Sequence, residues 1–197
     1  YWTVPYLPID PEDVGRTYDS DVIRINSQSG KGGVNYILKQ SHGISLPDKM
    51  REEMSYTAKR VSDQAHQELT PEWIYQIFCD NYINVDKKFH ITECHFVQED
   101  GIQAKATVES EGRTAVINGQ GNGRLDAVSN AIRSYLDVDY ELVDYEQHSL
   151  TKGSSSKAVS YVSITKDGQT FWGVGIDEDI IKSSYQALEV AVNKILD

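Results

Sequence analysis

The chain has 197 residues, of which 30 are acidic and 19 are basic, so its formal net charge is −11 at pH 7. This acidic balance argues against a nucleic-acid or anionic-membrane partner, because phosphate groups are bound by basic surfaces. A hydrophobic content of 39% is enough for a core, two cysteines are too few for a disulfide framework, and no apolar run approaches the roughly 18 residues of a membrane span. These features predict a folded cytoplasmic protein.

Residues 1–30 are rich in turn-forming residues and are expected to form an extended linker arm. Pro5, Pro8 and Pro11 fix the backbone φ angle and remove amide donors, which favours an extended conformation. The chain opens with Tyr1-Trp2-Thr3, and we interpret it as a fragment of a longer protein.

Residues 31–84 have helical apolar spacing and predict a small helical linker subdomain. Its first helix should end at Gly43, a typical C-terminal glycine, and its second should follow Pro47. The third should begin at Thr70-Pro71-Glu72, which supplies an N-cap hydroxyl, a proline in the first turn and an acidic side chain near the helix start.

From residue 87 the apolar period changes to two, which is typical of half-buried strands. The pattern predicts three strands and a helix, followed by the same order again, with the second set of strands near 140–149, 158–165 and 169–175. Neither β-β-β-α unit can bury its apolar faces alone. We therefore predict an α+β fold in which two units, 87–137 and 138–197, form one domain with pseudo-two-fold symmetry.

Both predicted strand-to-helix junctions carry alternating glycines, in Gly119-Gln120-Gly121-Asn122-Gly123 and in Gly173-Val174-Gly175-Ile176-Asp177. Their spacing differs from the G-x-G-x-x-G of dinucleotide-binding proteins, which argues against that cofactor. Two interpretations remain open. The glycines either form tight turns, or they expose N–H groups at the helix starts that hold a carboxylate.

The remaining reactive residues form no recognisable catalytic or metal site. The five histidines lack metal-binding spacing, and His90, Cys94 and His95 alternate between strand faces. Neither cysteine lies in a setting that lowers a thiol pKa. Asp177-Glu178-Asp179 is expected to form a solvated first helical turn, with a cation site as the lesser alternative. Residues 29–33 are expected to be a flexible connector.

Several strings are similar to the 2-isopropylmalate synthase family, and the likeness extends over the whole chain. The most specific are Val4-Pro5-Tyr6-Leu7-Pro8-Ile9-Asp10-Pro11 and Ile25-Asn26-Ser27-Gln28-Ser29-Gly30-Lys31-Gly32-Gly33-Val34, supported by Gly121-Asn122-Gly123 and Trp172-Gly173-Val174-Gly175-Ile176. The resemblance implies the part of the longer form of the enzyme that follows its catalytic barrel.

The family condenses acetyl-CoA with 2-oxoisovalerate in leucine biosynthesis. The resemblance implies that its divalent metal and catalytic base belong to the barrel, so this fragment should hold no cofactor and should be inactive alone. It also implies that residues 1 to about 84 are linker subdomains reaching the partner subunit's active site. Residues 87–197 would then be the allosteric domain, which forms a homodimer and binds leucine for feedback inhibition.

The resemblance also implies leucine-binding residues at both junctions and on the strands between them. They are Gly121, Asn122, Gly123, Leu125 and Asp126, then Leu142, Tyr145 and Ser149, then Ser156 and Ala158, and finally Gly175 and Ile176. Tyr6 resembles a linker residue that couples this domain to catalysis.

Three residues depart from the family pattern. Arg124 replaces a common proline, and Asp126 and Ser149 replace alanine. Two alternatives therefore stay open: a dimerisation scaffold that has lost its effector site, and the regulatory domain of citramalate synthase, which senses isoleucine.

Overall fold

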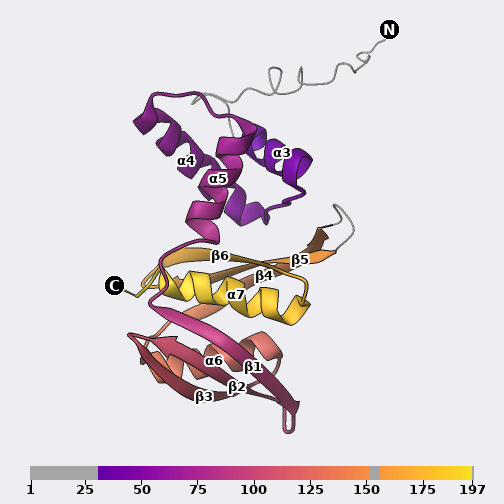
Figure 1. Ribbon diagram of the computed structural model, residues 1–197, viewed down its shortest axis with the longest axis vertical. Helices are drawn as coiled ribbons and strands as arrows, with labels where there is room; N and C mark the ends of the chain where they lie inside the picture. The colour runs from indigo at the N-terminus through magenta and orange to yellow at the C-terminus, as the bar shows by residue number, and fades with distance from the viewer. Residues whose placement is uncertain (1–30, 151–155, 197) are drawn as a thin grey trace. The chain divides into compact units, whose positions relative to one another are not determined.

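The computed structural model describes residues 31–150 and 156–196, so the predicted linker arm and Tyr6 lie outside the described residues. The chain divides into two compact units, Tyr1–Phe78 and Cys79–Asp197. The helices α3 (Lys31–His42), α4 (Asp48–Ala65) and α5 (Pro71–Tyr82) come first along the chain (Figure 1). Among the described residues, no helix is long and apolar enough to cross a membrane.

Local capping signals set the ends of these helices. Gly43 has a φ of 70°, and its N–H donates to the Lys39 carbonyl at 3.0 Å, which ends α3. At the start of α5, the Thr70 hydroxyl accepts a hydrogen bond from the Trp73 N–H at 3.2 Å. Both predicted helix boundaries are therefore confirmed.

The second unit contains two three-stranded antiparallel sheets, each followed by a helix. The first half consists of β1 (Phe89–Gln98), β2 (Ile102–Ser110), β3 (Arg113–Gly121) and α6 (Arg124–Leu136). The second consists of β4 (Glu141–Leu150), β5 (Lys157–Lys166), β6 (Gln169–Asp177) and α7 (Ile180–Asn193). The predicted α+β class and the duplicated β-β-β-α order are confirmed.

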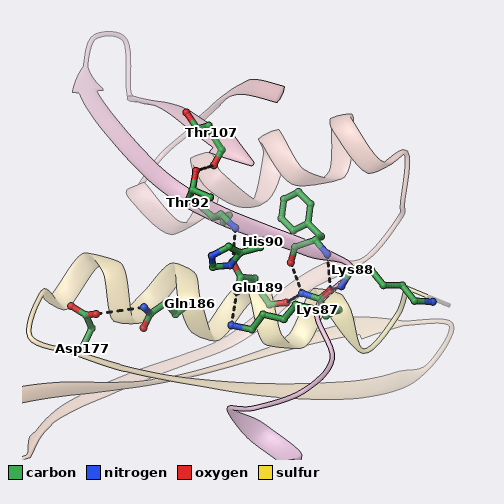
Figure 2. A network of polar contacts seen from close by, with 11 residues as sticks. Lys87, Lys88, His90, Thr92, Thr107, Asp177, Gln186 and Glu189 are labelled. Carbon is green, nitrogen blue, oxygen red and sulfur yellow. Dashed lines mark hydrogen bonds and ion pairs between the residues drawn. The ribbon is translucent and has the colours of Figure 1, made fainter. Parts of the chain in front are cut away.

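Each helix packs on its own sheet and also holds the start of the other sheet. The Arg133 guanidinium of α6 donates to the Tyr140 carbonyl, next to β4, at 2.8 Å. The Glu189 carboxylate of α7 accepts from the Ile91 N–H of β1 at 2.6 Å, and Figures 1 and 2 show α7 running beside that strand. Because the two halves exchange these contacts, they share one buried core, as the pseudo-two-fold arrangement requires.

Four of the alternating glycines, Gly119, Gly121, Gly173 and Gly175, lie inside strands, where they allow close packing against helices. β3 continues to Gly121, and β6 continues to Asp177, two residues beyond its predicted end at 175. A Cβ on Gly119 would lie 2.3 Å from the Ala127 carbonyl oxygen, and one on Gly175 would lie 2.1 Å from the Ser183 carbonyl oxygen. The interpretation as tight turns is therefore wrong for these four glycines, whereas Gly123 does lie in the two-residue turn between β3 and α6.

The structure also corrects the alignment of the two halves. Ala127 and Ser183, which contact Gly119 and Gly175, are each the fourth residue of their helix. Gly119 is thus equivalent to Gly175 and not to Gly173, so matching the two glycine motifs by their first glycines would misalign the halves by two residues. The N-cap residues of the two helices, Gly123 and Asp179, are equivalent in the same alignment.

Candidate functional site

The second sheet has a face that its helix covers only in part. α7 packs on β5 and β6. On the same face, Tyr145 pairs with Val162 and Ser149 pairs with Ala158, while Tyr145 remains 46% exposed. We call the helix-side residues of this edge strand the β4 strip: Leu142, Tyr145, Gln147 and Ser149. The strip offers apolar and polar groups side by side at the open edge of a buried core.

Strand pairing brings most of the predicted second-half site residues to this face. Ala158 pairs with Ser149 and Asp177, and Gly175 pairs with Ser160, all on the helix side. Ile176 pairs with Val159, so its side chain lies on the opposite face of the sheet. Ser156 is exposed and precedes β5.

The other predicted residues lie at the first junction, in the other half of the unit. Gly121 ends β3, Gly123 is the N-cap of α6, and Leu125 is 9% exposed. The Asn122 N–H donates to a carboxylate oxygen of Asp126 at 3.1 Å. The predicted residues therefore form two groups on different sheets.

The two helix starts differ in their capacity to bind an anion. At α7, an Asp179 oxygen accepts from the N–H groups of Ile181 at 2.9 Å and Lys182 at 3.2 Å. At α6, the N-cap residue Gly123 has no side chain to cap the first N–H groups. The first junction is thus the more available site for a carboxylate. The prediction that Asp177-Glu178-Asp179 forms a helical turn is wrong, because α7 begins after Asp179.

Close packing, and not a left-handed backbone, explains why glycine occupies positions 121 and 175. Neither residue has a positive φ angle. A Cβ on Gly121 would lie 2.7 Å from the Ala127 amide nitrogen, just as one on Gly175 would meet the backbone of α7. Both glycines therefore keep a strand close to its own helix.

A buried polar cluster beside the β4 strip was missed by sequence reasoning. The Gln147 side-chain amide nitrogen lies 2.7 Å from the Ser160 hydroxyl, 3.2 Å from the Ser183 hydroxyl and 3.0 Å from the Ile180 carbonyl oxygen. Ser160 and Ser183 are fully buried and 2.8 Å apart. With the two halves correctly aligned, the first half has apolar residues at the same places, Phe96, Ala104 and Ala127. This difference between the two halves was the sequence signal that could have identified the polar cluster.

Burial raises the pKa of two titratable side chains near the first sheet. It raises the pKa of the Cys94 thiol to about 11, which confirms that this cysteine lacks an activating setting. Burial, with a smaller contribution from Cys94, raises the pKa of Tyr185 to about 12. Within residues 31–150 and 156–196, no three His, Cys, Asp or Glu side chains are grouped to hold a metal ion.

Two surface hollows lie away from the predicted residues. One, of about 450 Å³, is lined by residues of α3, α4 and the loop between them. The other, of about 380 Å³, is lined by residues of the first sheet, such as His90 and Glu109, and by Lys87 just before it. Neither is lined by a residue of the β4 strip or of the first junction.

Comparisons with known proteins match this arrangement. The sequence model of the LeuA allosteric (dimerisation) domain matches residues 68–196, and that of the alpha-isopropylmalate synthase post-catalytic domain matches residues 1–39. The chain is 48% identical to the 2-isopropylmalate synthase of Helicobacter hepaticus over 99% of this chain and 37% of that protein. It is also 48% identical to the one of Desulfitobacterium hafniense and 38% identical to the one of Rhizobium meliloti, again over the full chain.

The chain spans about a third of the length of these relatives, from 35% to 37%. Its duplicated β-β-β-α unit lies within the region matched by the allosteric domain. The chain therefore belongs to the LeuA allosteric (dimerisation) domain family found in 2-isopropylmalate synthases.

Proposed function

We propose that this chain is the regulatory part of a 2-isopropylmalate synthase and that it binds leucine as a feedback inhibitor. The observation that carries the proposal is the half-exposed β4 strip at the edge of the core, in a chain of the allosteric domain family. An isobutyl group buried against apolar side chains of the β4 strip would gain about 1.5–3 kcal/mol from the removal of apolar surface from water.

The first junction supports the placement of the effector's carboxylate. The N-terminal N–H groups of α6 lack a side-chain cap, whereas those of α7 are bound by Asp179. Free N–H donors and the helix dipole favour an anion. Asp126 already accepts the Asn122 N–H, so a ligand carboxylate would bind beside this pair on the remaining donors.

A homodimer accounts for the separation of the two groups of residues. The β4 strip and the first junction belong to different sheets. We propose that two copies of the chain bring the strip of one protomer to the first junction of its partner. An effector bound between two subunits biases how they pack, which is how a binding event can change a distant active site.

The condensation of acetyl-CoA with 2-oxoisovalerate belongs, in this proposal, to a catalytic barrel that carries the divalent metal. The described residues do not fit that metal, because residues 31–150 and 156–196 contain no suitable group of ligands. We expect the purified chain to give no CoA release from these substrates. Turnover above the uncatalysed rate would contradict this assignment.

Titration calorimetry with leucine, isoleucine and valine in parallel tests the proposed function. Preferential heat with leucine supports it. Preferential binding of isoleucine would favour the citramalate synthase alternative. The absence of binding at millimolar concentrations would favour a dimerisation scaffold whose site has been lost through Asp126 and Ser149.

A further inference from the structure

We infer that Gln147 recognises the ammonium group of the effector through its side-chain carbonyl oxygen. This inference rests on the proposed amino-acid site and adds to it a residue from the middle of the β4 strip. Gln147 lies on the same face of β4 as Tyr145 and Ser149, because residues two apart on a strand point to the same side. It therefore lies between two of the expected effector contacts.

The orientation of the Gln147 amide is fixed by its surroundings. The Ile180 carbonyl oxygen is only an acceptor, so the Gln147 atom at 3.0 Å from it must be the amide nitrogen. The same nitrogen contacts the hydroxyls of Ser160 and Ser183, which are held by the sheet and by α7. Three contacts on one end of the amide leave its carbonyl oxygen directed away from this cluster.

That carbonyl oxygen is an oriented acceptor at an exposed position. Within residues 31–150 and 156–196, no hydrogen bond reaches it, and the Gln147 side chain is exposed. An acceptor that is already held in place binds a charged donor without a further loss of side-chain entropy. A primary ammonium group supplies such a donor, and a hydrogen bond to a charged group is stronger than one between neutral groups.

The comparison of the two halves supports a recognition role over simple packing. In the equivalent row of the first sheet, Phe96 and Ala104 are both apolar, and that half packs well without a polar cluster. The pseudo-symmetric fold thus does not require Gln147. The second half has the polar residues where its edge strand is left open.

The test compares the leucine affinity of the wild-type chain with the affinities of the Gln147→Met and Gln147→Glu variants. Methionine has a similar length and cannot accept the hydrogen bond, so leucine affinity should fall by about tenfold or more. Glutamate keeps an acceptor oxygen and adds a negative charge that attracts the ammonium group, although its other oxygen would face the Ile180 carbonyl, so affinity should fall clearly less than in Gln147→Met. Gln103→Met, the same change at an exposed position on β2, is the control and should change nothing.

Equal weakening in both Gln147 variants, or no weakening in Gln147→Met, would overturn the inference and leave the effector function standing. A wild-type chain that binds no leucine would overturn the effector function, and this inference with it. Should Gln147→Met fail to fold, 2-hydroxy-4-methylpentanoate decides the matter with wild-type protein, because it lacks the ammonium group. It should bind at least about tenfold more weakly than leucine, and a smaller difference would overturn the inference.

Discussion

Replacement of Glu189 by leucine should loosen the connection between the two halves of the allosteric domain. Glu189 is 1% exposed, and one of its oxygens accepts from the Ile91 N–H at 2.6 Å and lies 3.0 Å from His90 Nδ1 (Figure 2). Its other oxygen makes an ion pair with Lys87 Nζ at 2.8 Å but receives no well-aligned hydrogen bond. Leucine fills a similar volume and removes all three contacts.

The expected loss of stability follows from the groups that Glu189→Leu would leave without a partner. The buried Ile91 N–H would lose its charged acceptor, at a cost of about 1–3 kcal/mol. Lys87 is 31% exposed and can reach water, so the loss of its partner adds at most about 1 kcal/mol. We therefore expect Glu189→Leu to lower the free energy of unfolding by about 1–4 kcal/mol, and Glu189→Gln, which keeps an acceptor, by roughly half as much.

Urea unfolding at pH 7, followed by circular dichroism, measures this change through the transition midpoint and slope. Glu178→Leu is the matched control, because Glu178 is exposed just before α7, and it should shift the free energy by less than about 0.5 kcal/mol. If Glu189→Leu proved as harmless as the control, the contact between α7 and β1 would not hold the halves together.

Three further outcomes are expected. Gly175→Ala should destabilise the domain by about 1–3 kcal/mol in urea unfolding, because its Cβ would overlap the backbone of α7. Gly123→Ala meets nothing within 4 Å and only weakens an N-cap, so it should cost less than about 1 kcal/mol, and equal effects would refute the close-packing explanation. Burial raises the pKa of Tyr140 to about 12 from 10, so the stability that its neutral form contributes is complete below pH 10 and is lost as the pH rises towards 12. Tyr140→Phe should therefore flatten the decline in melting temperature at alkaline pH, and an unchanged decline would contradict this role of Tyr140. Light scattering at high micromolar concentration should return a dimer, and a monomer alone would contradict the proposed assembly.

The sequence predicted those features that depend on neighbouring residues. The ends of α3 and α5 follow from Gly43 and from Thr70 with Pro71, because capping groups act within one turn. The duplication was visible because strand and helix periods differ, and each half repeats both. These signals were sufficient for the α+β class and for the order of the elements.

The features that the sequence did not predict depend on tertiary packing. The repeated G-x-G motif suggested that Gly121 matches Gly175, whereas strand pairing and helix contacts match Gly119 with Gly175. Likewise, the sequence alone shows Gln147 only as one polar residue of an alternating strand. Its partners are 13, 33 and 36 residues away, so its role depends on how α7 crosses the sheet.

The predicted effector residues came from family resemblance, and the structure separates them into two groups. Tyr145, Ser149 and Ala158 share one face of the second sheet, while residues 121–126 form the first junction. Which of them contact a ligand depends on a second copy of the chain, which no local pattern can specify. Their part in leucine binding therefore stays a prediction.

Amide chemical-shift mapping of the labelled chain during a leucine titration tests the central proposal most directly. We predict saturable shifts that are largest at Tyr145, Ser149 and Ala158 and at residues 121–126, with little change on the outer face of β2, for example at Lys105 and Thr107. Shifts confined to other surfaces, or no saturable shifts at millimolar leucine, would contradict the proposal that the β4 strip and the first junction form the effector site.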